Sequence, residues 1–236
     1  MPVPRFRVVC EGPTDFTVIK AVLSALLGQR FVVTLIQPEI PKFSGPAPDE
    51  DLGTGWQGVR NWCQQRANAL RGLGGDVNAA PGRVPSVLIV HVDADIANKK
   101  GIGCEKPCPP PGPTADALRS VVLEWGGAQD VPAGVVLCVP SKKTEAWVFA
   151  ALHPGDRLAT RALECRKRPE ALLINRPDRL VRRKRVQQAG RAKRTYDKDT
   201  DAYEAVASRI AAAWPDVCRI CTQAQRFDDE LREALG

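Results

Sequence analysis

Residues 8–15 of the chain read Val8-Val9-Cys10-Glu11-Gly12-Pro13-Thr14-Asp15, and they join two kinds of local structure. The apolar run that ends at Cys10 predicts a short buried strand, closed by Glu11-Gly12. A helix is predicted directly after it, with Thr14 as its N-cap and Gly28 as its stop. A strand that passes straight into a helix is the opening unit of an α/β fold.

The same alternation continues along the chain. Residues 87–92 form a continuous apolar run, which is typical of a central strand buried on both faces of a parallel sheet. Two more strands are expected at 31–36 and 135–139, and helices at 56–73, 114–125 and 144–152. The sequence therefore predicts an α/β fold with a mostly parallel four-stranded sheet flanked by helices.

Two parts of the chain are expected to pack as one domain. Residues 1–153 would form the α/β part that carries the chemistry. Residues 154–236 would form a basic, helical C-terminal part that closes with helices at 199–214 and 222–235.

Four carboxylates follow two of the predicted strands. Glu11 and Asp15 come after the first strand, and Asp93 and Asp95 come after the strand at 87–92. Functional groups of such sheets gather at the carboxyl ends of the strands. Mg²⁺ prefers carboxylate oxygens, and Mn²⁺ is expected to substitute for it. We expect Glu11, Asp93 and Asp95 to be catalytic, as metal ligands or as a general acid/base, with Asp15 as a further ligand.

These two stretches resemble the two motifs of the Toprim domain, a hydrophobic strand followed by E-G-x-x-D and a hydrophobic strand followed by D-x-D. The resemblance covers roughly residues 5–150. It implies a Rossmann-like parallel sheet with a Mg²⁺ site at the four carboxylates. Residues 140–147, Pro140-Ser141-Lys142-Lys143-Thr144-Glu145-Ala146-Trp147, resemble a segment of OLD-like and RloB-like Toprim proteins of bacterial defence systems. That resemblance implies Glu145 as a further metal ligand. The structural alternative is that the Glu145 carboxylate satisfies free N–H groups at the start of a helix capped by Thr144.

Positive charge is concentrated in one segment. Residues 157–198 hold 15 Lys and Arg against 4 Asp and Glu, a net charge of +11 within a chain of net charge +7. Clustered Lys and Arg bind phosphate backbones, although a charge run is often only a solvated surface. The candidate nucleic-acid-binding residues are Lys142, Lys143, Arg182, Arg183, Lys184, Arg185, Arg191, Lys193, Arg194 and Lys198.

The cysteines and histidines carry less information. Eight cysteines in a chain that begins without a secretory-type leader are expected to be mostly reduced thiols, in a cytoplasmic protein. Zinc at Cys104, Cys108, Cys218 and Cys221 is the less favoured reading of their spacing. His91 lies inside a predicted strand and is expected to be a satisfied core residue. No apolar run approaches the roughly 20 residues of a membrane helix.

The leading hypothesis is a Mg²⁺-dependent Toprim nuclease acting on DNA or RNA. Because the chain has no Walker-type phosphate-binding motif, ATP hydrolysis would have to come from a partner ATPase, as in phage-defence systems that pair the two proteins. Two alternatives stay open. One is an RNA-maturation ribonuclease of the Toprim type, and the other is a non-catalytic nucleic-acid-binding or effector subunit of an ATPase complex.

Overall fold

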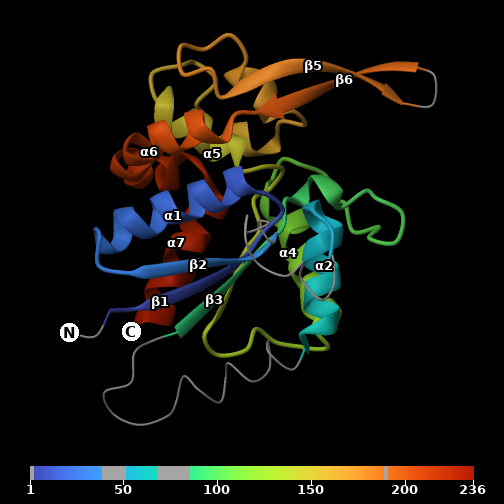
Figure 1. Ribbon diagram of the computed structural model, residues 1–236, viewed down its shortest axis with the longest axis vertical. Coiled ribbons are helices and arrows are strands. Elements are labelled where there is room, and N and C mark those ends of the chain that lie inside the picture. Colours follow the sequence, from blue (N-terminus) through green and yellow to red (C-terminus); the bar gives the residue numbers. More distant parts are fainter. Residues whose placement is uncertain (1–2, 39–51, 68–85, 189–190) are drawn as a thin grey trace, which may run out of the picture.

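The computed structural model describes residues 3–38, 52–67, 86–188 and 191–236, and no side chain of residues 186–194. A four-stranded parallel sheet lies at its centre, in the order β2-β1-β3-β4 (Figure 1). Its strands are β1 (Arg5–Val9), β2 (Val32–Gln37), β3 (Ser86–His91) and β4 (Val135–Cys138). The predicted α/β class with a parallel four-stranded sheet is confirmed.

Helices cover both faces of this sheet (Figure 1). The side chains of β3 alternate between them: Val87 and Ile89 enter one apolar core, and Leu88 and Val90 enter the other. The first core includes α1 (Pro13–Leu27), α5 (Glu145–Leu152), α6 (Thr200–Ile220) and α7 (Thr222–Leu235). The second includes α2 (Gly55–Gln65) and α4 (Gly112–Trp125).

The C-terminal part packs on the α/β part, because α6 lies against both α1 and α5. The basic residues at 181–198 are not helical, contrary to the sequence-based expectation. They form an antiparallel hairpin of β5 (Val181–Gln188) and β6 (Arg191–Lys198), which projects away from the sheet (Figure 1). Arg, Lys and Gln favour helices in isolation, but here the two strands pair along their whole length.

Several element boundaries also differ from the predicted ones. The N-cap of α1 is Gly12 rather than Thr14, and Pro13 takes the first helical position, where its missing N–H costs nothing. Helix α6 continues through Pro215 to Ile220, because Trp214 and Val217 on either side are buried in the core. The helix predicted over 56–73 ends at Gln65, and residues 68–73 lie outside the described residues.

A disulfide joins Cys108 to Cys165 across 57 residues. It links the loop after the short 3-10 helix η1 (Ala94–Ile96) to a second one, η2 (Leu163–Cys165). The assignment of Cys108 to a free thiol or a zinc ligand was therefore wrong, and the sequence spacing gave no sign of its partner. The other six cysteines are free thiols.

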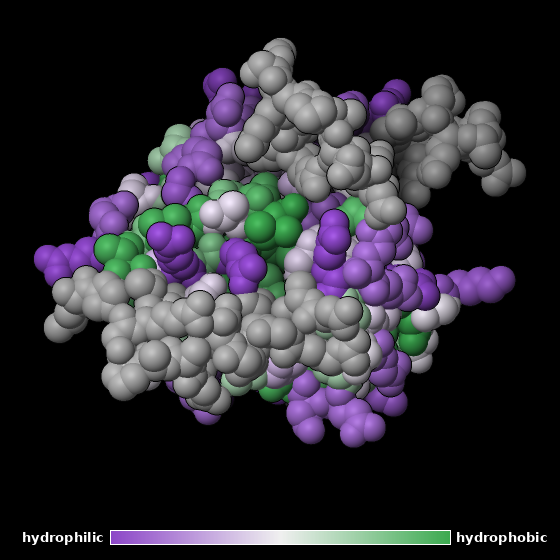
Figure 2. All heavy atoms as spheres, turned by 60° about the horizontal axis from the view of Figure 1, so that its bottom comes forward, coloured by the Kyte–Doolittle hydropathy of each residue, from purple (hydrophilic) through white to green (hydrophobic). Residues whose placement is uncertain are grey.

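Exposed apolar side chains lie near the amino ends of the strands. The exposed large apolar side chains of the described residues are Val3, Val32 and Val131, which lie at or before the amino ends of β1, β2 and β4. Figure 2 shows hydrophobic residues gathered between hydrophilic ones on the face opposite the hairpin. No helix in the described ranges has the length and apolar character that crossing a membrane requires.

One buried carboxylate ties η2 to the start of α7. Glu164 is 1% exposed and accepts hydrogen bonds from the Trp147 indole, from the backbone and hydroxyl of Thr222, and from the Gln223 backbone. Removing this acceptor would leave the buried donors of Trp147 and Gln223 without their partner.

We predict that Glu164→Ala lowers the free energy of unfolding by about 3 kcal/mol. Glu164→Gln keeps one side-chain oxygen and should cost less than Glu164→Ala. Urea denaturation followed by circular dichroism measures both. Equal stability of Glu164→Ala and the unchanged protein would contradict the assigned role.

Candidate functional site

The parallel pairing of β1 with β3 brings the two acidic motifs together. Val9 pairs with Val90, so the turns that follow both strands lie at the same edge of the sheet. There, Glu11 Oε1 accepts a hydrogen bond of 2.8 Å from the backbone N–H of Asp93. The first motif is thereby bonded directly to the second.

A pocket of about 330 Å³ opens at this edge. The four predicted carboxylates Glu11, Asp15, Asp93 and Asp95 all line it, together with the ammonium-bearing side chains of Lys143 and Lys198. The remaining lining residues are Gly12, Pro13, Thr14, Gly55 and Thr200. Acidic and basic groups from distant parts of the chain therefore share one cavity.

Gly12 does not adopt a backbone conformation that requires glycine. Its φ of −161° is extended backbone that any residue adopts. A Cβ there would meet nothing closer than Asp15 Oδ2, at 3.6 Å.

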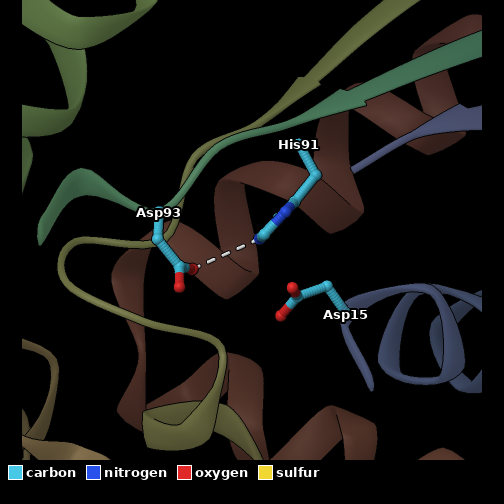
Figure 3. Close-up of side chains that lie close together, drawn as sticks. All are labelled: Asp15, His91 and Asp93. Atoms are coloured by element: carbon cyan, nitrogen blue, oxygen red, sulfur yellow. Dashed lines mark ion pairs between the residues drawn. The ribbon is translucent and has the colours of Figure 1, made fainter. Parts of the chain in front are cut away.

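The innermost part of the site is formed by Asp15, His91 and Asp93, whose ligand atoms lie within 4.8 Å of one another (Figure 3). His91 Nε2 lies 3.3 Å from Asp93 Oδ1. His91 is fully buried, as expected of a core residue, but neither ring nitrogen makes a hydrogen bond of normal geometry to a described residue. The expected core position of His91 is confirmed, but its ring faces the carboxylates and pairs with Asp93 instead of making hydrogen bonds within the core.

Thr144 holds two of these carboxylates in place. Its hydroxyl donates to Asp15 Oδ1 at 2.7 Å, and its backbone N–H donates to Asp93 Oδ1 at 3.2 Å. Thr144 is the N-cap residue of α5, but its side chain makes no capping bond. The hydroxyl that was expected to cap a helix instead orients the site.

A second group, made of the buried Glu145 and Tyr203 and the partly exposed Lys198, lies beside Asp15. Lys198 Nζ lies 2.6 Å from Glu145 Oε1 and 4.0 Å from Asp15 Oδ1. The Tyr203 hydroxyl donates to the same Glu145 oxygen at 3.1 Å. Glu145 is fully buried, and its Oε2 has no hydrogen-bond partner among the described residues. The structure thus places Glu145 against a lysine and a tyrosine, and it is absent from the innermost group of Asp15, His91 and Asp93.

On the outer side, Lys143 joins two acidic groups. Its Nζ lies 3.2 Å from Asp95 Oδ2 and 3.5 Å from Glu170 Oε1. Glu170 belongs to η3 (Pro169–Leu173) and is buried, with no partner for Oε2 in the described part of the chain. Glu170 follows no predicted strand end and belongs to no motif, so sequence reasoning did not find it.

The crowding of buried charges shifts the protonation of the site. Burial, together with the nearby Asp93, raises the pKa of Glu11 to about 8, and burial raises the pKa of Asp93 to about 6. Burial opposes ionisation of Asp15 as well, but Lys198 and His91 outweigh it and lower its pKa. For His91, burial lowers the pKa, yet Asp15 and Asp93 outweigh this effect and raise it to about 9.

A divalent cation suits the donor set. Asp15 and Asp93 each use Oδ1 for hydrogen bonds or ion pairs, and each leaves Oδ2 without a hydrogen bond to a described residue. These two oxygens, with Glu11 beside them, are hard ligands of the kind that Mg²⁺ prefers. The open pocket gives room for the waters that Mg²⁺ keeps.

The predicted nucleic-acid-binding residues fall into four groups. Lys143 and Lys198 line the acidic pocket. Lys142 is buried and pairs with Glu105 at 3.1 Å, so it presents no free cation at the surface. Residues 182–185 are exposed on β5, where Arg182 pairs with Asp199. The side chains of Arg191, Lys193 and Arg194, on β6, lie outside the described part of the structure.

The comparisons with known proteins add no relative. No protein-family model, no curated protein and no solved structure matches the chain.

We predict that Lys198→Met lowers the free energy of unfolding by about 3 kcal/mol, because it leaves Glu145 buried beside Asp15 without a cation. Lys20→Met is the matched control, since Lys20 pairs with Glu204 at 3.9 Å on the surface and should lose less than about 1 kcal/mol. Both values come from urea denaturation in the presence of EDTA. Similar losses in the two variants would show that Lys198 does not neutralise a buried carboxylate.

Proposed function

We propose that this protein is a Toprim-type nuclease that hydrolyses phosphodiester bonds with the help of Mg²⁺. The observation that carries the proposal is that Glu11, Asp15, Asp93 and Asp95 line one pocket. The two motifs, the parallel sheet and the position of the carboxylates at strand ends agree with the resemblance to Toprim domains. The resemblance to OLD-like and RloB-like proteins further suggests a partner ATPase and a setting in phage defence.

Asp15 and Asp93 are the residues assigned to hold the ion, with Asp95 at the mouth of the pocket. When bound, Mg²⁺ would supply Lewis-acid stabilisation of the phosphate and of the leaving oxygen. His91 and Thr144 orient Asp93 and Asp15, since both contact these carboxylates directly.

Glu11 is assigned to proton transfer. It lines the same pocket but lies outside the group of Asp15, His91 and Asp93 whose ligand atoms gather within 4.8 Å. In the hydrolysis, a water oxygen forms the new bond to phosphorus, the bond from phosphorus to the leaving oxygen breaks, and the water proton passes to Glu11 and on to that oxygen. Lys143 and Lys198 offset the negative charge of the phosphate oxygens.

The main test is cleavage of labelled single-stranded and duplex DNA and RNA with Mg²⁺ or Mn²⁺. We predict cleavage that EDTA abolishes and that Asp93→Asn lowers by at least about a hundredfold. Calorimetry should show that Asp93→Asn also weakens Mn²⁺ binding. The control is Asp130→Asn, which removes an exposed carboxylate before β4, at the opposite edge of the sheet.

Absence of cleavage for every substrate and both ions would overturn the proposal in favour of a non-catalytic binding subunit. If only structured RNA is cleaved, the substrate is that of a maturation ribonuclease.

Thr144 provides a separate test of positioning. We predict that Thr144→Val lowers kcat about tenfold with little change in KM, because it removes the hydrogen bond to Asp15 and keeps the backbone bond to Asp93. Thr144→Ser retains the hydroxyl and should restore most of the rate. A rise in KM with unchanged kcat would assign Thr144 to substrate binding instead.

A further inference from the structure

A second pocket adjoins the acidic one. It has a volume of about 440 Å³ and shares Lys143 and Lys198 with the acidic pocket. Its other lining residues are Arg168, Glu170, Arg183, Thr195 and Tyr196. A polymeric ligand that occupies the acidic pocket can therefore extend past Lys143 and Lys198 into the second pocket.

The pleat of the hairpin explains why Arg183 and Tyr196 face this pocket. Arg183 pairs with Tyr196, and Val181 pairs with Lys198, so these four residues lie on the same face of the hairpin. Val181 is buried, and Lys198 reaches Glu145, so this face is turned toward the body of the protein. Arg183 and Tyr196 lie two residues from Val181 and Lys198 along their strands, which places them about 7 Å farther from the carboxylates.

The charges of this pocket favour a phosphate group. Lys198 is engaged with Glu145, and Lys143 is engaged with Asp95 and Glu170. Arg168 and Arg183, both exposed, have no ion pair with a described carboxylate, and a planar guanidinium matches the oxygens of a phosphate. Two guanidinium groups are thus free to bind an anion.

The other lining residues favour a nucleotide over a bare anion. The half-buried ring of Tyr196 offers an aromatic surface for a base. The buried Oε2 of Glu170 has no hydrogen-bond partner in the described ranges, and it would repel a lone phosphate but accept a hydrogen bond from a base amino group or a sugar hydroxyl. A base can reach the ring only when it is unpaired and out of its stack.

We propose that this pocket binds one unpaired nucleotide next to the phosphodiester that occupies the acidic pocket. Arg168 and Arg183 hold its phosphate, and Tyr196 contacts its base. The inference rests on the proposed nuclease function and adds its substrate class, a nucleic-acid strand that is single-stranded beside the cleaved bond.

The test measures fluorescence anisotropy of a labelled single-stranded oligonucleotide that has no terminal phosphate, in EDTA. Arg168→Ala and Arg183→Ala should each weaken binding roughly tenfold. Arg166→Ala removes an exposed arginine two residues from Arg168 that does not line the pocket, and it should leave affinity within about twofold. Equal losses in all three variants would overturn the proposal in favour of general charge attraction.

The base contact has its own readouts. Tyr196→Phe keeps the ring and should bind normally, whereas Tyr196→Ala should bind roughly tenfold more weakly. Because Tyr196 also packs against the core, the unchanged protein is tested in parallel with an oligonucleotide of abasic sites and with a blunt duplex. Both should bind more weakly than the intact single strand, and equal affinity for all three would overturn the base contact.

These measurements do not depend on a divalent ion. A protein that binds single strands through Arg168 and Arg183 but cleaves nothing would contradict the nuclease function alone. A protein that cleaves with unchanged affinity in both arginine variants would contradict the nucleotide pocket alone.

Discussion

The hydrogen bond from the Asp93 backbone N–H to Glu11 Oε1 joins the ends of β1 and β3, and the candidate site is built around it. It depends on the parallel register in which Val9 lies beside Val90. A shift of one residue along β3 would turn its alternating side chains over, so that Ile89 and Val90 would exchange their two cores. The packing of both faces therefore fixes the register, and the register fixes the distance between two acidic turns that are about 80 residues apart in the sequence.

The buried carboxylates of this site oppose folding unless cations accompany them. Lys198 lies between Glu145 and Asp15, Lys143 lies between Asp95 and Glu170, and His91 lies beside Asp93. Each cation arrives from a different element, namely the end of β6, the loop before α5 and the end of β3. The arrangement leaves Oδ2 of Asp15 and of Asp93 without a hydrogen bond to a described residue. Buried carboxylates whose pKa values are shifted in this way gather at functional sites.

The sequence was sufficient for features that depend on local pattern, and insufficient for those that depend on packing between distant elements. Continuous apolar runs predicted the parallel strands, and their ends located Glu11, Asp15, Asp93 and Asp95. Glu170 and Tyr203 could not be found in this way, because they reach the site only through the packing of η3 and α6. The hairpin was missed because the helix propensity of its residues carries no information about a second stretch of chain with which they could pair. The Cys108–Cys165 disulfide was missed because 57 residues separate the two cysteines. Thr144 was read as a helix cap, since its bond to Asp15 spans 129 residues.

The hairpin and the acidic pocket meet within three residues of chain. β6 ends at Lys198 and α6 begins at Thr200, and both residues line the acidic pocket. Asp199 between them fixes the junction, because its side chain accepts from the Ala202 N–H at the start of α6 and pairs with Arg182 of β5. Only Asp199 separates the hairpin from α6, so the junction itself sets the direction of the hairpin relative to the carboxylates. The same covalent continuity couples Lys198, the cation between Asp15 and Glu145, to the strand that presents Tyr196. The charge balance of the site and the position of the strand that carries Tyr196 therefore both depend on one short segment, residues 196–200.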